Sequence, residues 1–98
     1  MADRITITPD ELRSSSQTFN SKADEITDIL EQLRSEVDSL ESTWDGAAQD
    51  SFFQSYEEMN QTLVQFPEIL QGIAQQLTAV ADTLEQTDEE LASALGGN

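Results

Sequence analysis

Residues 42–49 read Ser-Thr-Trp-Asp-Gly-Ala-Ala-Gln (STWDGAAQ) and lie near the middle of a chain of 98 residues. The stretch holds the single tryptophan, Trp44, and two residues later Gly46, which can adopt a positive φ or act as a flexible joint. We therefore expect a turn at 44–46, with Asp45 able to cap the helix that follows. Because so short a connection makes the flanking helices antiparallel neighbours, the stretch predicts a helical hairpin.

The segment before the turn has the signals of one long helix, from about residue 9 to 43. Thr8 and Glu11 have the spacing of a capping box, and Pro9 falls at the first helical position, where its missing N–H costs nothing. After one gap of seven, apolar residues recur at spacings of three and four, the heptad pattern of a helix seam. The seam consists of Leu12, Phe19, Ala23, Ile26, Leu30, Leu33, Val37, Leu40 and Trp44.

A second helix is expected from about residue 47 to 93, with a similar seam. Its members are Phe52, Tyr56, Met59, Leu63, Phe66, Leu70, Ile73, Leu77, Val80, Leu84, Leu91 and Leu95. Pro67 interrupts this helix but not its apolar phase, which favours a kink within one helix over two separate helices. The second helix is longer than the first, so its last turns should overhang before a loose end at 96–98.

The hairpin leaves further apolar positions beside the two seams. They are Ile29 on the first helix, and Phe53, Val64, Ile69, Ala74 and Ala81 on the second. Scattered surface hydrophobes need no explanation, but a wide apolar face without a cover marks an association surface. We predict an all-α, single-domain hairpin over residues 1–98 that dimerises into a four-helix bundle, with Ile29, Phe53, Val64 and Ile69 as interface candidates. A homodimer is the simplest closure, and a related helical hairpin is the alternative partner.

The charge of the chain narrows the possible partners. Four Lys/Arg and twenty Asp/Glu give a net charge of −16. Such a surface repels nucleic-acid phosphates and anionic lipid head groups, so we expect neither nucleic-acid binding nor stable membrane insertion at neutral pH. The first residues, MADRITITPDEL, lack the apolar core of a secretory signal peptide. We expect a protein that is made in the cytoplasm and either stays there or leaves without a cleavable signal.

The residue types for most catalytic chemistry are missing. The chain has neither histidine nor cysteine, which removes the usual proton shuttle, thiolate nucleophiles and the commonest zinc ligands. No EF-hand loop or glycine-rich phosphate loop is present, and adjacent acids such as Glu57 and Glu58 are typical of a solvated helix face. We therefore predict no enzyme activity, no cofactor and no metal site.

With its length of about a hundred residues and Trp44-Asp45-Gly46 at the bend between two amphipathic helices, the sequence resembles the WXG-hundred family. The resemblance covers essentially residues 5–95. These are small proteins related to the early secreted antigenic target and exported by type VII (ESX) secretion systems. The resemblance implies a small secreted protein exported folded as a dimer, with Trp44 and Gly46 as the turn motif.

The end of the second helix bears on the branch of the family. The export pattern Tyr-x-x-x-Asp/Glu of the mycobacterial branch is absent, because the only tyrosine, Tyr56, is followed four residues later by Asn60. The pattern of the Gram-positive, single-gene branch is present instead, as Leu84, Asp88, Leu91 and Leu95. Plain continuation of the seam also explains the three leucines, so only Asp88 adds information.

The resemblance further implies an antiparallel homodimer in which the turn of one chain lies near the tail of the other. That composite end would be recognised by an FtsK/SpoIIIE-type motor ATPase of the secretion machine. The protein would act as a secretion substrate, and as an adaptor or virulence effector through helix–helix contacts. Two alternatives remain from the sequence: a cytoplasmic helical chaperone or adaptor for a larger client, and an effector that inserts into membranes on acidification.

Overall fold

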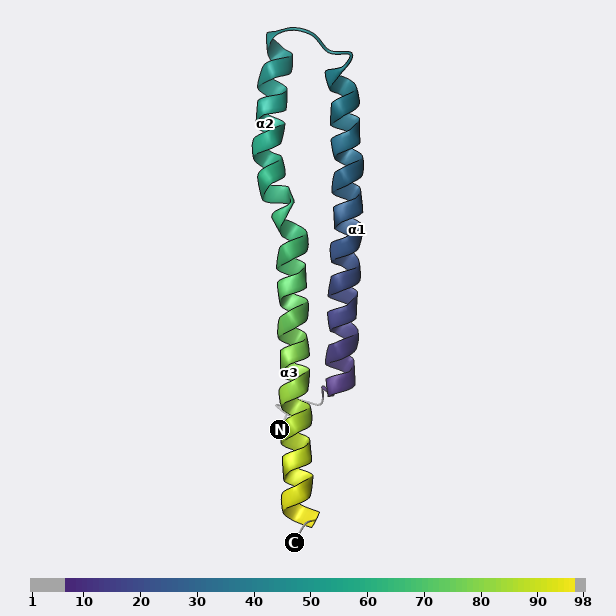
Figure 1. The fold of residues 1–98 in the computed structure, drawn as a ribbon, viewed down its shortest axis with the longest axis vertical. Coiled ribbons are helices and arrows are strands. Elements are labelled where there is room, and N and C mark those ends of the chain that lie inside the picture. The colour runs from purple at the N-terminus through teal and green to yellow at the C-terminus, as the bar shows by residue number, and fades with distance from the viewer. Residues whose placement is uncertain (1–6, 97–98) are drawn as a thin grey trace, which may run out of the picture.

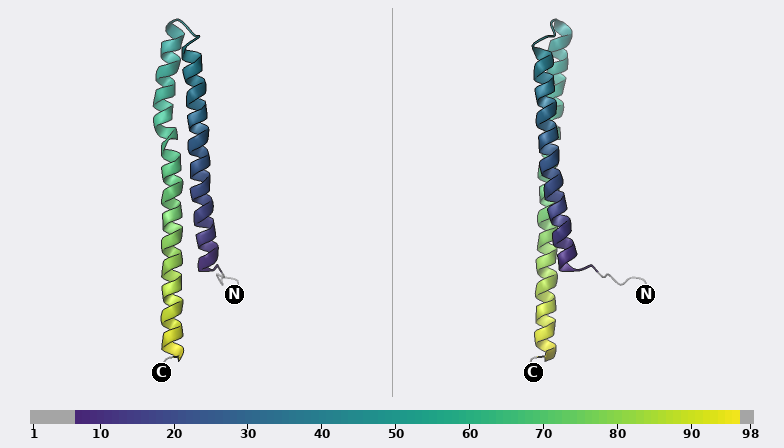
Figure 2. Two further views of the ribbon diagram at one scale, coloured as in Figure 1. Left: turned by 45° about the vertical axis from the view of Figure 1, so that its right-hand side comes forward. Right: turned by 90° about the vertical axis from the view of Figure 1, so that its right-hand side faces the viewer.

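A computed structural model describes the backbone of residues 7–96 and the side chains of residues 7–91. Three helices follow one another: α1 (Pro9–Glu41), α2 (Ala47–Leu63) and α3 (Gln65–Gly96). They form a rod of 79 × 24 × 18 Å in which α1 runs antiparallel to α2 and α3 (Figures 1 and 2). The predicted all-α hairpin is confirmed. Residues 97 and 98 of the expected loose end lie outside the described residues.

The start of α1 carries the capping box that the sequence indicated. The Thr8 hydroxyl accepts the backbone N–H of Glu11 at 3.1 Å, and the Glu11 carboxylate accepts the N–H of Thr8 at 2.9 Å. Pro9 occupies the first helical position. Two N–H groups that the first turn would otherwise leave unpaired are thereby satisfied, which fixes where α1 begins.

The second half of the hairpin is interrupted at Val64. The Val64 N–H still donates to the carbonyl oxygen of Asn60 at 3.0 Å, and α3 begins at the next residue. Pro67 therefore stands in the first turn of α3, where a backbone donor is not needed. A proline there has no N–H for the carbonyl of Leu63 and crowds the preceding turn, so the interruption falls three residues before it. Figure 1 shows α3 continuing the rod that α2 begins, with a small offset.

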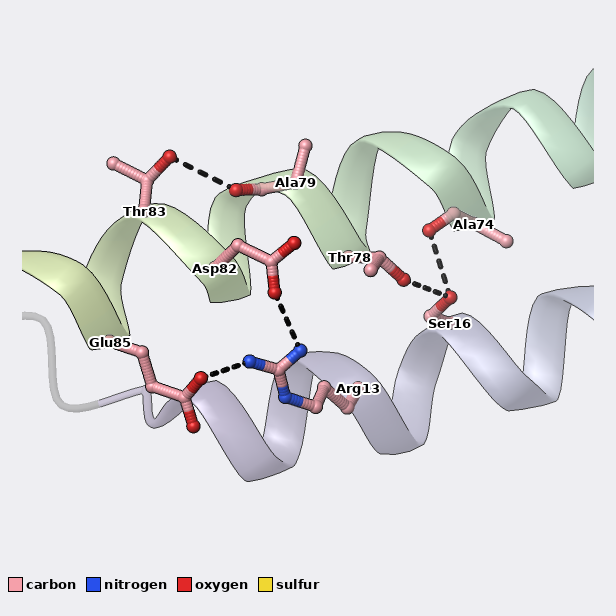
Figure 3. Close-up of polar contacts among 8 residues, drawn as sticks. All are labelled: Arg13, Ser16, Ala74, Thr78, Ala79, Asp82, Thr83 and Glu85. Carbon is pink, nitrogen blue, oxygen red and sulfur yellow. Dashed lines mark hydrogen bonds and ion pairs between the residues drawn. The ribbon is translucent and has the colours of Figure 1, made fainter.

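Small side chains form the closest part of the contact between α1 and α3. Ser16, Ala23, Ala74 and Ala81 are all buried, and no large side chain is completely enclosed among the described residues. The Ser16 hydroxyl donates to the carbonyl oxygen of Ala74 at 2.8 Å and lies 2.9 Å from the Thr78 hydroxyl (Figure 3). Because neither helix presents a bulky residue at these positions, their backbones approach closely enough for a side chain to reach the opposite main chain.

Ion pairs join the helices on either side of this contact. The Arg13 guanidinium donates to Asp82 at 2.9 Å and also to Glu85, so it ties the start of α1 to α3 (Figure 3). Nearer the turn, Arg34 binds the Glu57 carboxylate at 2.8 Å and Asp38 at 3.5 Å. These pairs are exposed, so they set the register of the hairpin more than its stability.

The contact line differs from the seam expected from the sequence. Ala74 and Ala81, expected beside the seam, are buried against α1, whereas the seam residues Leu33, Leu40, Phe66 and Val80 are half exposed. The expectation was wrong at these positions because it assigned the largest apolar residues to the contact. Where two helices approach most closely, only the smallest side chains fit between them. Much of the apolar surface is consequently left outside the hairpin.

Candidate functional site

Three aromatic rings gather at the turn end of the hairpin. The ring centroid of Trp44 lies 5.3 Å from that of Phe52 and 5.8 Å from that of Phe53, and the two phenylalanines are 5.2 Å apart. Tilted and edge-to-face pairs at these distances are favourable beyond the area they bury. The tryptophan lies in the connection between α1 and α2, and the phenylalanines lie in α2, so the cluster packs the connection against the first turns of α2. All three rings remain half-buried and part of their surface faces outward.

The turn itself depends on Gly46. Its φ of 114° and ψ of 176° lie in a region that is essentially restricted to glycine. Gly46 is also the N-cap of α2, and no side chain caps this helix. The expected cap by Asp45 was therefore wrong, because the glycine backbone brings the chain into α2 one residue later. The Gln49 side chain instead donates to the carbonyl oxygen of Glu41 at 3.1 Å and ties α2 to the end of α1.

One side of the hairpin carries a row of half-exposed apolar residues, which we call the apolar face. It consists of Ile29, Leu33 and Leu40 from α1 with Phe66, Ile69 and Val80 from α3. Ile29 is 50% exposed and Ile69 is 54% exposed, which is unusual for isoleucines in a packed helix pair. No other described segment of the chain covers them.

The helix geometry places these residues on one side. Ile29 and Ile69 each precede a leucine, Leu30 and Leu70, that is half-buried, as expected for the side of a helix that faces its neighbour. One residue turns a helix by about 100°, and both steps go backward along the chain. Because α1 and α3 are antiparallel, a backward step of one residue from the contact line leads to the same side of the hairpin on both helices. The apolar face is therefore one surface.

The four predicted interface residues do not all lie on this surface. Ile29 and Ile69 belong to the apolar face, whereas Phe53 is part of the aromatic cluster at the turn. Val64 is 45% exposed and lines a groove where α2 gives way to α3. The sequence thus named four exposed or half-buried apolar residues, and the hairpin distributes them over three places.

The groove at the helix break has a volume of about 410 Å³. Apolar side chains from both halves of the hairpin line it, namely Leu30, Val64 and Pro67, together with the acids Glu31 and Glu68. Glu31 and Glu68 follow Leu30 and Pro67 by one residue, so they turn to the side opposite the apolar face. The groove and the apolar face are on opposite sides of the hairpin.

The basic residue at the groove is already paired. Hydrogen bonding to Arg34 lowers the pKa of the Glu57 carboxyl, and the same bond raises the pKa of the Arg34 guanidinium. Arg34 also lies 5.8 Å from the ring centre of Tyr56, whose hydroxyl is buried without a hydrogen-bond partner within the described part of the chain. Little unbalanced positive charge is left on this surface.

The far end of α3 extends past the start of α1 (Figure 1). Of the predicted export pattern, Leu84 is half-buried, Asp88 is exposed and Leu91 is 57% exposed. Leu95 belongs to the backbone of α3, and its side chain lies outside the described residues. The overhang thus presents at least one large apolar side chain without a cover inside its own chain.

Neither metal-binding nor membrane-spanning features occur in the described structure. Residues 7–91 contain no group of three Asp or Glu side chains arranged to hold a metal ion. None of the three helices is both long and apolar enough to cross a membrane, as far as residues 7–96 go.

The described residues thus form a small helical hairpin with an uncovered apolar face and a Trp-x-Gly bend. The chain matches the family model WXG100, described as proteins of 100 residues with WXG, over residues 4–89, and it belongs to this family. Its tripeptide is Trp44-Asp45-Gly46, whose rings and backbone form the turn described above.

Relatives match along nearly their whole length. The chain is 38% identical over 94 residues to an ESAT-6-like protein of Streptococcus agalactiae, covering 96% of this chain and 98% of that one. It is 28% identical to type VII secretion system extracellular protein A of Staphylococcus aureus, with 94% and 95% of the two chains covered. The crystal structure of EsxA from Geobacillus thermodenitrificans superposes with a TM-score of 0.79 at 31% identity, covering 92% and 98%.

Proposed function

We propose that this protein is a substrate of a type VII secretion system and is exported as a folded homodimer. The observation that carries the proposal is the uncovered apolar face of a WXG100 hairpin. The staphylococcal relative is named as an extracellular protein of such a system, which supports the same destination for this chain. Its action is by protein–protein contact, and it involves no catalysis.

The dimer follows from the energetics of the apolar face. Ile29, Ile69 and their neighbours each leave about half of their surface in water, and burial of apolar area stabilises by about 25 cal/mol per Å². A second copy, turned by a twofold axis, presents the same face and closes a four-helix bundle. A related hairpin with a similar face would fit as well, which is how the protein could serve as an adaptor for a co-exported client.

We assign the export signal to both ends of this dimer. An antiparallel pair brings the aromatic turn of one copy, with Trp44 and Gly46, near the overhang of the other. The exposed Leu91 and the charge of Asp88 then offer an edge that an FtsK/SpoIIIE-type ATPase binds as a helix in a groove. Leu84 and Leu95 complete the same heptad row.

Secretion of tail variants tests this assignment. In a strain with an intact type VII system, Asp88→Ala and Leu91→Ala should remain dimeric and accumulate in the cells rather than in the medium. Glu90→Ala, which removes a neighbouring exposed acid outside the pattern, is the matched control and should be exported normally. Normal export of the Asp88 and Leu91 variants would show that the overhang is not the signal.

Trp44→Leu separates the fold from the signal at the turn. Leucine keeps the heptad but loses the ring contacts to Phe52 and Phe53. We expect the Trp44→Leu variant to remain dimeric but to be no longer exported. If the dimer is lost as well, Trp44 acts in assembly, and the turn has no separate part in the signal.

A further inference from the structure

We propose that the groove at the helix break binds a basic, amphipathic segment of another protein. The apolar floor of Leu30, Val64 and Pro67 takes a large apolar side chain, and the acids beside it bind flanking Lys or Arg residues. This inference does not depend on the proposed export, because the groove belongs to the single hairpin.

The position of the groove keeps it open in a dimer. Ile29 and Glu31 lie on either side of Leu30, and Phe66 and Glu68 lie on either side of Pro67. One member of each pair belongs to the apolar face, and the other lines the groove. A second copy seated on the apolar face therefore leaves both grooves of the dimer exposed, one on each outer side.

Charge complementarity identifies the occupant. Glu31 and Glu68 line the groove, and its one basic lining residue, Arg34, is already bound by Glu57 at 2.8 Å. Asp28 and Asp24 precede Glu31 by three and seven residues, so these exposed acids continue its row along α1 beyond the groove. A ligand that meets this row must be both extended and cationic.

The dimensions also favour a protein segment. A volume of about 410 Å³ admits one or two large side chains and not a whole helix. The groove therefore holds an apolar anchor, while the helix that carries it lies across the surface and places its basic residues against the acids. This combination of a buried anchor and a charged rim is the common form of helix recognition.

Two synthetic peptides with the same leucine positions test the proposal on the full-length protein. One carries lysines on its polar face and the other carries glutamates at the same places. In NMR titrations the lysine peptide should shift the amide signals of Leu30, Glu31, Val64 and Glu68, and the glutamate peptide should not bind. Equal binding of the two peptides, binding of neither, or shifts confined to the apolar face would each overturn the proposal.

Variants of the groove provide the second measurement. Glu31→Gln combined with Glu68→Gln should weaken the lysine peptide about fivefold, as expected for the loss of two exposed ion pairs. Glu36→Gln combined with Glu89→Gln removes the same charge at exposed positions that do not line the groove, and should change the Kd less than twofold. Equal weakening of peptide binding by both double variants would show that the peptide responds only to the overall charge of the protein, and would contradict a specific site.

Val64→Arg supplies an independent check on the floor of the groove. Val64 is half exposed at the end of α2, so a longer side chain fits there without disturbing the helix contact. The guanidinium would occupy the groove and abolish binding, while the helical circular dichroism and the melting temperature stay unchanged. Full binding by this folded variant would place the peptide elsewhere.

Discussion

The hydroxyl group of Ser16 on α1 donates a hydrogen bond of 2.8 Å to the main-chain carbonyl oxygen of Ala74 on α3. A side chain as short as serine reaches the opposite backbone only where two helices nearly touch. Ala23 follows Ser16 by seven residues, and Ala81 follows Ala74 by seven, so the close approach repeats after two helical turns. Small residues at heptad spacing thus decide which sides of the helices meet.

Enlarging Ser16 should destabilise the hairpin. In Ser16→Leu the extra methyl groups meet the α3 backbone, and overpacking of this kind costs about 1–3 kcal/mol. Urea unfolding followed by circular dichroism should show a lower midpoint, with all samples at one protein concentration because an associating protein gains stability with concentration. Ser21→Leu, at an exposed position of α1, is the control and should unfold near the wild-type midpoint. An unchanged midpoint for Ser16→Leu would contradict the close approach.

Two glycines should respond in opposite directions to the same substitution. Gly46 has a φ of 114°, a backbone conformation that strains any residue with a side chain, so Gly46→Ala should destabilise the protein by about 1–3 kcal/mol. The cost is backbone strain rather than a steric clash, because a Cβ at this position meets no atom within 4 Å. Gly72 lies inside α3 without a positive φ, and a Cβ there also meets nothing. Gly72→Ala should therefore stabilise by up to about 1 kcal/mol. Thermal unfolding of the pair measures both, and a stable Gly46→Ala would show that the turn tolerates other backbone angles.

The ion pair of Arg34 and Glu57 should contribute to stability in a limited pH range. The pKa of Glu57 is lowered in the folded protein by its hydrogen bond to Arg34. Above the ordinary glutamate pKa both the folded and the unfolded chain carry the charge, and the contribution is complete. As the pH falls, the unfolded chain takes up its proton first, so the contribution is lost below that ordinary pKa.

Acidification also relieves charge repulsion over the whole protein. Comparison of the wild type with Glu57→Gln at each pH cancels this general effect and leaves the contribution of the ion pair. The difference in urea midpoint should be constant from about pH 7 to pH 5 and should decrease progressively as the pH falls below the ordinary glutamate pKa. It should also shrink at high salt, because the pair is exposed. Glu58→Gln, at the next exposed position, serves as control. A difference that persists at the acid end would mean that Glu57 acts through packing rather than through its charge.

The features of the fold that could be predicted from the sequence are those that depend on short local patterns. The capping box at Thr8 and the glycine turn at Gly46 each depend on a few neighbouring residues, and both appear in the structure. The resemblance to the family rested on Trp44-Asp45-Gly46 in this setting, and the family match supports it. Local chemistry therefore determined the hairpin.

The rotation of the helices about their axes was not predictable in the same way. A spacing of three and four residues leaves two adjacent rows of apolar positions, and large residues such as Leu33 and Phe66 stand out more than Ala74. Small residues recurring at intervals of seven were the overlooked signal. The groove depends on where the interruption at Val64 falls relative to α1, a relation between segments that no local pattern contains.

The apolar face gives a direct prediction for assembly. Ile69→Glu places a charge in the middle of that face, and the cost of burying it should raise the dimer dissociation constant by at least tenfold. Gln75→Glu adds the same charge to α3 on the side away from the face and should leave association unchanged, since it stays in water. Sedimentation equilibrium at micromolar concentrations compares the two with the wild type. A wild-type protein that remains monomeric in that range would contradict the four-helix bundle, whereas equal weakening by both variants would implicate net charge rather than the apolar face.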